Sequence, residues 1–498
     1  MKCSATKTLG AGSVLVKRAS AAIGLLVLAS GAQAAVHGIK GPTFNLTAAA
    51  GYITQPDGAR IYSWGYGCDG APAGYLPAQA AGSCPQMQLP GPTLIVTQDD
   101  VVTVTLKNLL PAVAGRTSIV FPGMDVTSPG TTGGLLTKEA VNGGTVTYTF
   151  TAGKPGTYAY YSGTQADLQI EMGLSGAIIV LPNGAGATAA ACKPKGPYSL
   201  AASAYAHKDT CYDREYLFEF SELSSKIHEQ VETQVTACSA ASCPPITVVT
   251  EPYHPNYYLV NGRSMPDDMD AAYSTSYPNQ PYNGNPHMHP GENVLMRVIG
   301  QGRWQHPFHF HGNHARVLAR DASLILASTG TTPPTATTPL AGPLLFTIAT
   351  VSGQTVDAIF TWTGQGLNWD VYGTQPHKCN GSDLPTIPGA ASAQSAGFDP
   401  GTHEYCGDHG KPIPVTPPDP SIVVNGQWYA GTPYLGLQDV GNQTPEAPGT
   451  LNQNPQGGYA YMWHSHNERE ITTNDVFPGG MMMMLLIDPY SWTIDETL

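Results

Sequence analysis

The sequence predicts an all-β protein made of two Greek-key β-sandwich domains, with a long irregular insertion in the second. The chain has 498 residues, of which 41% are hydrophobic, and this exceeds what a single core normally supports. The 56 Gly and 43 Pro residues disfavour helix interiors and divide the chain into short segments. Four of these segments occur twice in the same order, which indicates an internal duplication.

Each copy of the duplication consists of short, turn-bounded stretches in which apolar and polar residues alternate. An alternation with a period of two is typical of a β-strand with one buried face. Several such strands at close, turn-bounded spacing are typical of a Greek-key sandwich. The corresponding stretches are 90–106 with 290–298, 118–123 with 305–312, 144–150 with 353–360, and 156–180 with 458–487.

The duplication and the changes in composition predict the organisation of the chain. We expect a first domain at 36–182, a linker at 183–212 and a second domain at 213–490. The insertion at 372–456 is dense in Pro, Gly, Asn and Gln, as expected of a long surface excursion.

Residues 1–34 have the features of a secretory leader. Lys2, Lys7, Lys17 and Arg18 precede an apolar stretch at 21–31, and small residues follow before Ala35. The apolar stretch is shorter than the roughly 20 residues that span a bilayer. We therefore expect an exported protein, periplasmic, cell-surface or extracellular, with no membrane span.

The cysteines predict disulfide bonds. Eight of the nine cysteines follow the leader, and an even number in an exported chain favours disulfides over metal thiolates. We expect pairing between cysteines that are close in sequence. The predicted pairs are Cys68 with Cys84, Cys192 with Cys211, Cys238 with Cys243, and Cys379 with Cys406.

The charge of the chain argues against one class of partner. The formal net charge is −13, and the chain contains no basic run. Nucleic-acid binding depends on clustered Lys and Arg that neutralise phosphates. A nucleic acid is therefore not expected among the partners.

Two His-x-His motifs carry the chemistry that the sequence predicts. The segments are His306-Pro307-Phe308-His309-Phe310-His311 and Trp463-His464-Ser465-His466. Residues two apart on a strand point the same way, so each pair aims two imidazoles at one point. Imidazole suits Cu, Zn, Fe or Ni. The alternative is that these are ordinary hydrogen-bonded or exposed histidines, but two pairs at matching positions of one domain favour a metal site.

The order of the segments, the two histidine motifs and the terminal Gly-Met segment at 479–484 resemble the multicopper oxidases. That family is built from repeated cupredoxin domains, and two repeats make this chain similar to its two-domain members. The resemblance implies a cupredoxin-like fold for both domains. In the family, four His-x-His motifs from the first and last domains hold a trinuclear copper cluster. A separate type 1 copper is held by two His, a Cys and often a Met.

The family's copper ligands are only partly present. His309, His311, His464 and His466 fall on the cluster ligands of the last domain, whereas the matching stretches of the first domain, 120–122 and 161–163, contain no histidine. The resemblance therefore implies one or two copper ions in the second domain.

The type 1 positions depart further from the family pattern. His306 falls on one type 1 histidine and Met481 on the axial position, but Ser465 replaces the cysteine and Glu470 the second histidine. His306, Glu470 and Met481 are additional metal-ligand candidates. Because no thiolate is available at this position, no type 1 blue copper is expected.

Several neighbouring residues have both an ordinary and a functional interpretation. Glu468 and Glu470 could bind the metal, orient an imidazole, or pair with Arg469 or Arg316, and a solvated loop is the ordinary alternative. His287-Met288-His289 is also a copper-type triplet, for which an exposed loop is favoured. The methionines at 481–484 match a core strand of the first domain, which favours packing over copper transport.

Three functions are compatible with these residues. The first, which the resemblance favours, is a copper-dependent oxidoreductase of multicopper-oxidase type that oxidises a small molecule or a metal ion, with its catalytic residues unassigned. The second is a non-enzymatic copper-binding or carrier protein of the cell envelope. The third is a structural surface protein with a decayed metal site. Two-domain relatives form their cluster between subunits, so the resemblance allows a homo-oligomer such as a trimer.

Overall fold

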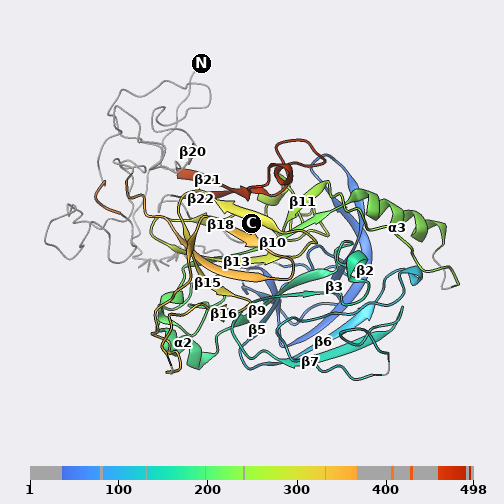
Figure 1. Ribbon diagram of the computed structural model, residues 1–498, viewed down its shortest axis with the longest axis horizontal. Coiled ribbons are helices and arrows are strands. Elements are labelled where there is room, and N and C mark those ends of the chain that lie inside the picture. The colour runs from blue at the N-terminus through green and yellow to red at the C-terminus, as the bar shows by residue number, and fades with distance from the viewer. Residues whose placement is uncertain are drawn as a thin grey trace, which may run out of the picture. The chain divides into compact units, whose positions relative to one another are not determined.

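The computed structural model describes the two predicted repeats and the segment between them (Figure 1). The predicted leader and most of the insertion at 372–456 lie outside the described residues. The described residues are 36–78, 82–130, 132–196, 198–238, 242–330, 332–366, 405–408, 427–429, 458–488 and 493–494.

The first sandwich consists of a five-stranded sheet, in the order β4-β1-β5-β9-β8, and a four-stranded sheet, in the order β3-β2-β6-β7. Its core contains Trp64, Leu94, Val104 and Tyr160, which come from both sheets. Alternate residues of β6 are buried, as the period-two pattern predicts. The strands are β1 (Gly38–Lys40), β2 (Thr43–Thr54), β3 (Arg60–Cys68), β4 (Tyr75–Leu76), β5 (Leu94–Thr97), β6 (Val101–Asn108), β7 (Thr145–Thr151), β8 (Gly156–Tyr161) and β9 (Ser175–Leu181).

The second sandwich consists of one sheet in the order β11-β10-β13-β19-β15-β16, with β17 on β15, and one in the order β12-β22-β21-β14-β18, with β20 on β21. Phe218, Phe308, Trp463 and Met483 pack between them. The strands are β10 (Arg214–Leu223), β11 (Tyr257–Val260), β12 (His287–Met288), β13 (Asn293–Gly300), β14 (His306–Phe310), β15 (Ala315–Arg320), β16 (Ser323–Leu324), β17 (Leu344–Leu345), β18 (Thr347–Thr350), β19 (Thr355–Thr361), β20 (Gln427–Tyr429), β21 (Gly458–Ser465) and β22 (Met482–Ile487).

The predicted all-β class is confirmed, and helices are few and short among the described residues. They are α1 (Ala166–Gln169), α2 (Gly184–Ala190) and α3 (Ser225–Ala237), with single 3₁₀ turns η1 (Ala112–Ala114), η2 (Lys208–Thr210), η3 (Asp267–Met269) and η5 (Glu468–Ile471). In the described part of the chain, none of these helices has the length and apolarity that crossing a membrane requires.

Helix α3 follows the first strand of the second sandwich but packs on the first. Its buried residues Ile227 and Val231 join the core of the first sandwich, and the helix lies against β3 (Figure 1). His228 of the same helix places Nδ1 2.5 Å from the carbonyl oxygen of Tyr62. The helix thereby ties the two sandwiches together.

The two sandwiches also share buried contacts. Ile95 and Ile179 of the first pack with Leu217 and Ile299 of the second. The buried carboxylate of Asp357 on β19 accepts hydrogen bonds from the hydroxyl groups of Thr157 on β8 (2.6 Å) and of Tyr205 (2.5 Å). Because residues of the predicted linker, such as Leu200, join the same cluster, the domain boundaries at 182 and 213 stay a prediction.

Three of the four predicted disulfides are confirmed. They join Cys68 to Cys84, Cys192 to Cys211, and Cys238 to Cys243. Cys406 is also disulfide-bonded. Its predicted partner, Cys379, lies outside the described residues.

The core of the second sandwich can be tested by truncating one leucine. Leu485 of β22 is fully buried, whereas Leu135 is 91% exposed. We expect Leu485→Ala to lower the free energy of unfolding by about 2–5 kcal/mol, because it removes buried methyl groups and leaves a cavity. Leu135→Ala should change it by no more than about 0.5 kcal/mol. Urea denaturation checks both, and equal effects would contradict this assignment of the core.

Candidate metal centre

The two His-x-His motifs lie on adjacent antiparallel strands. The register of β14 and β21 places His309 directly opposite His464. Phe308 and Phe310 alternate with the histidines of β14 and point into the core, where both rings pack against Trp463. The same alternation places His309 and His311 on the opposite face of the strand. The apolar residues of the motif therefore fix the orientation of the imidazoles.

The four imidazoles form one cluster. The ring centroid of His309 lies 4.9 Å from those of His311 and His466 and 5.5 Å from that of His464. His311 and His464 bring their Nε2 atoms to 3.3 Å from each other. One ring nitrogen from each of His309, His311 and His464 lies within 4.8 Å of the others. A single ion can be reached by all three.

The Nδ1 atoms of His309 and His464 both have hydrogen-bond partners outside the cluster, which leaves Nε2 of each ring for the cluster. Nδ1 of His309 lies 2.8 Å from Oγ1 of Thr347. Nδ1 of His464 donates to the carbonyl oxygen of Ser465 at 2.7 Å, which leaves Nε2 of His464 unprotonated in the neutral ring. Such outer hydrogen bonds are typical of metal-binding histidines, because they fix the tautomer and the ring plane.

The electrostatics of the cluster favour neutral imidazoles. Burial, followed by the charges of His311, His464 and His466, lowers the pKa of His309 to about 4. Burial and the neighbouring histidines also lower the pKa of His311, and burial is the main cause that lowers the pKa of His464. Neutral imidazoles can bind a cation without first losing a proton. The donor set and its protonation therefore fit a transition-metal ion such as copper.

His306 has a different environment from the four clustered histidines. It is fully buried, with Nε2 2.8 Å from Oε2 of Glu222 and Nδ1 2.9 Å from Oε2 of Glu470. Burial lowers the pKa of His306, but the hydrogen bonds and charges of both glutamates outweigh burial and raise it to about 9. The two carboxylates therefore hold a protonated imidazole between them.

The type 1 positions implied by the resemblance come together around this ion pair. Ser465 donates its hydroxyl proton to Oε2 of Glu470 at 2.5 Å. The backbone of Met481 bonds to both Glu470 and Ser465, while its side chain belongs to the core. Every cysteine among the described residues is in a disulfide, so none of them supplies a thiolate. Hydrogen bonds and charge pairing connect His306, Glu470 and Ser465.

Glu222 is the residue of this site that the sequence analysis missed. It lies on β10 and reaches His306 across 84 positions of sequence. Its Oε1 also accepts the backbone N–H groups of Arg303 and Trp304. The available signal was a set of carboxylates, including Glu215 and Glu219, that alternate with large apolar residues on one buried strand, since buried charges need partners.

The other candidates have partners of their own. Glu468 is exposed, whereas Glu470 is buried, and Arg469 pairs with Asp475 at 3.3 Å. His287 and His289 pair with Asp488 and Glu292, and Met288 between them is fully buried. The segment His287-Met288-His289 is therefore not the exposed loop that we expected. It is partly buried, it includes strand β12, and both of its histidines pair with carboxylates. Met481, Met482 and Met483 are buried, as core packing predicts.

The first sandwich repeats the backbone arrangement without the imidazoles. Val120 and Tyr161 form an antiparallel bridge. They lie in the stretches that match the histidine motifs of the second sandwich. The duplication therefore preserves the strand pairing, and the side chains at this position are apolar or phenolic.

A family model matches a part of the chain that lies in the first sandwich. Residues 79–184 match a family model described as multicopper oxidase. The chain resembles the cupredoxin-type multicopper oxidases. This family implies copper as the metal and supports a copper-dependent oxidoreductase. No curated protein matches the chain.

Several solved structures of low sequence identity are similar to this chain. The blue copper oxidase from Nitrosomonas europaea is 16% identical, with 89% of this chain and 85% of that chain covered and a TM-score of 0.47. The multicopper oxidase mgLAC is 14% identical, with 91% and 88% covered and a TM-score of 0.46. A copper nitrite reductase from Nitrosomonas europaea is 17% identical, with 65% and 85% covered and a TM-score of 0.39.

The protonation of His306 predicts a pH dependence of stability. Its pKa in the folded protein is about 9, against 6.5 for an unperturbed histidine. The stabilisation from this pairing is therefore complete below pH 6.5 and is lost as the pH rises through 9. Nitrogen NMR of the metal-free protein should show a protonated His306 ring at neutral pH and a neutral His309 ring, which serves as the control. A neutral His306 at that pH would contradict the prediction.

Proposed function

We propose that this protein is an exported copper-dependent oxidoreductase of multicopper-oxidase type. Its copper centre would have fewer ligands than that of the family, and it would have no type 1 blue copper. His309, His311, His464 and His466 would hold the copper. The observation that carries the proposal is the convergence of these imidazoles from two adjacent strands, with ring nitrogens of three of them within 4.8 Å of one another.

The chain's own residues support binding and orientation at this centre. Thr347 and the carbonyl oxygen of Ser465 hold the rings of His309 and His464, and the neutral rings are ready to coordinate. When bound, copper would supply a one-electron redox couple. His466 is exposed, and Phe346, whose ring contacts that of His309, is 54% exposed. A small molecule or metal ion could therefore approach the cluster from this side.

Export is supported by the disulfides and by the leader-like segment at 1–34. Disulfides form and persist in oxidising compartments outside the cytosol. Three of them are present among the described residues. The periplasm, the cell surface and the extracellular space all provide such conditions.

A non-enzymatic copper-binding protein is the second candidate. The observation that favours it is the ion pair of His306 with Glu222 and Glu470, which occupies the place where the resemblance puts the electron-accepting copper. Copper storage needs only affinity and no electron entry.

Copper binding and oxygen uptake by the purified protein test both candidates. We expect bound copper with a paramagnetic resonance spectrum of nitrogen ligation, together with substrate-dependent oxygen uptake. The double variant His309→Ala, His464→Ala should lose the copper, because it removes half of the imidazoles. A matched control is His254→Ala, which changes a histidine outside the cluster.

The outcomes separate the functions. Copper without oxygen uptake would favour a carrier. The absence of copper, or its retention in the double variant, would contradict the proposed centre and leave a structural role.

If the protein has no type 1 site, introducing a cysteine at position 465 should not create one. Ser465→Cys should not give the intense blue thiolate-to-copper absorption, because His306 stays paired with Glu222 and Glu470. Optical spectroscopy of the copper-loaded variant checks this. A blue protein would show that the carboxylates yield to copper at this position.

A further inference from the structure

The methionine run at 481–484 divides between the two faces of its sheet. Met483 of β22 belongs to the core of the second sandwich, as does Met481 just before the strand. Because side chains alternate along a strand, Met482 and Met484 lie on the opposite face. Met482 is 7% exposed, and Met484 is only partly buried. Packing in the core therefore accounts for one half of the run and leaves the other half unexplained.

The neighbouring strand presents another methionine to the same outer face. Trp463 of β21 is a core residue, so Met462 and His464 on either side of it lie on the outer face. The antiparallel register places Met462 directly opposite Met484, and His464 directly opposite Met482. Directly opposed residues of this kind have Cβ atoms about 4.5–5.5 Å apart. The thioethers of Met462 and Met484 therefore meet on a face that stays partly exposed.

Met269 adds a third sulfur atom beside this pair. It belongs to η3, which contacts β22. Its Sδ accepts the backbone N–H of Met484 at 3.4 Å. Thioethers from β21, β22 and η3 are therefore gathered around the position of Met484.

The corresponding positions of the first sandwich hold small residues. Tyr161 matches His464 in the duplication, and β8 pairs with β9 as β21 pairs with β22. The counterparts of Met462, Met482 and Met484 are Ala159, Ser175 and Ala177. The methionines thus occur in the repeat that carries the imidazoles and not in its copy.

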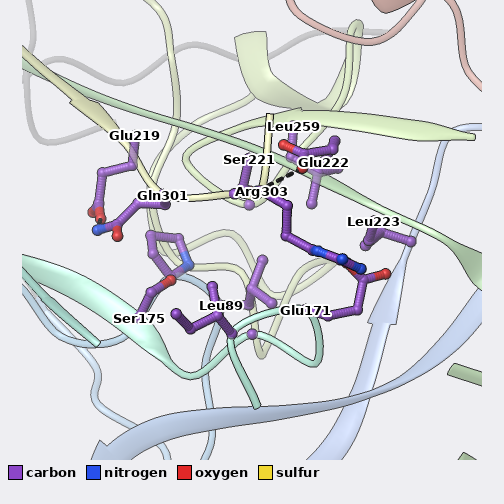
Figure 2. A pocket seen from close by; sticks show the side chains of 15 residues that line it. Leu89, Glu171, Ser175, Glu219, Ser221, Glu222, Leu223, Leu259, Gln301 and Arg303 are labelled. Carbon is purple, nitrogen blue, oxygen red and sulfur yellow. Dashed lines mark hydrogen bonds between the residues drawn. The ribbon is translucent and has the colours of Figure 1, made fainter. Parts of the chain in front are cut away.

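The matching face of the first sandwich is covered by the second sandwich. Ala177 packs with Leu217 and Ile299 of the second sandwich. Ser175 lies close to Gln301 at the same contact (Figure 2). Small side chains suit this close approach of two sheets. The methionines of the second sandwich instead lie beside a cluster of potential metal ligands.

The chemistry of the thioether group indicates which ligand such a face would take. Methionine sulfur is soft and polarizable, and soft ligands select Cu(I) over ions such as Ca²⁺ and Mg²⁺, which prefer oxygen. A monovalent copper ion accepts low coordination numbers, so a small set of thioethers is enough to hold it.

We propose that Met462 and Met484, assisted by Met269, form a binding site for Cu(I) on the outer face of β21 and β22. The site is distinct from the imidazole cluster but adjoins it. Met462 and His464 are two residues apart on β21, which corresponds to about 7 Å along a strand. Met482, opposite His464, lies between the two sets of ligands.

The position of the site gives it a role in loading the imidazole cluster. The thioethers would capture copper as Cu(I), and ligand exchange would then pass the ion to the imidazoles. The ion keeps its charge in this step, so no electron donor or acceptor is needed. This transfer rests on the proposed function, whereas the thioether site itself does not.

Silver titration of the full-length, metal-free protein tests the thioether site. Ag⁺ is a soft monovalent ion and serves as a redox-inert probe for Cu(I). With the methionine methyl groups labelled with ¹³C, we expect Ag⁺ to shift the resonances of Met462 and Met484. The resonances of Met481 and Met483, which face the core, should stay unchanged.

The same titration of His309→Ala, His464→Ala separates the thioether site from the copper centre. This variant lacks half of the imidazoles, yet the methyl shifts of Met462 and Met484 should persist. Failure of the proposed copper centre would therefore leave this result unaffected.

Leucine substitutions in that histidine variant provide a matched pair. Leucine has nearly the volume of methionine and no sulfur, so both proteins should fold. Met462→Leu, Met484→Leu should weaken Ag⁺ binding by more than about tenfold, because both opposed ligands are lost. Met481→Leu, Met483→Leu removes as many thioethers from the core face and should leave the affinity unchanged.

A loading experiment tests the transfer. Cu(I) is supplied anaerobically from its bicinchoninate complex, and nitrogen NMR follows its arrival at the ring of His464. Met462→Leu, Met484→Leu should slow this arrival by about tenfold or more, because no ion is held next to the cluster. Zn²⁺ binding to the imidazoles should be unchanged in this variant, which shows that the cluster is intact.

Two results would overturn the thioether site. One is that the methyl resonances of Met462 and Met484 do not respond to Ag⁺. The other is an Ag⁺ affinity of Met462→Leu, Met484→Leu that equals that of Met481→Leu, Met483→Leu. An unchanged rate of copper arrival would overturn the transfer.

Discussion

The pairing of β14 with β21 is the constraint on which the candidate metal centre depends. One face of this pair carries Phe308, Phe310 and Trp463 into the core, so the histidines between them have only the other face available. Burial of these aromatic side chains is worth several kcal/mol in total. Hydrophobic burial therefore contributes to the order of the imidazoles.

The histidines of β14 show how neighbours decide the chemistry of a side chain. His309 and His306 are three residues apart on one strand, yet the pKa of the first falls to about 4 and that of the second rises to about 9. His309 faces other imidazoles, which disfavour its charge, whereas Glu222 and Glu470 favour the charge of His306. Only the neutral ring is available to a metal ion. The protonated one holds β10, β14 and the segment after β21 together.

Features that depend on residues close together in the sequence could be predicted from it. Alternation predicted the strands, His-x-His spacing predicted which imidazoles share a face, and close cysteines predicted three disulfides. The sequence was insufficient where partners are distant in the chain. Glu222 gives no local sign that it will meet His306, and the apolar face of α3 does not say which sandwich it will cover. The meeting of Met462 with Met484 likewise arises only when β21 pairs with β22.

The ion pair around His306 also limits the evolutionary routes open to this chain. A cysteine-ligated copper at this position would require changes at Ser465, Glu470 and Glu222 together. Removal of both glutamates would leave the buried charge of His306 without a partner, and loss of a buried partner typically costs about 3–5 kcal/mol. Intermediates along such a path would be selected against for poor folding before they gained a new activity. The surrounding carboxylates thus disfavour a thiolate-ligated copper at this position, and sequence change is more readily tolerated at the exposed rim of the imidazole cluster.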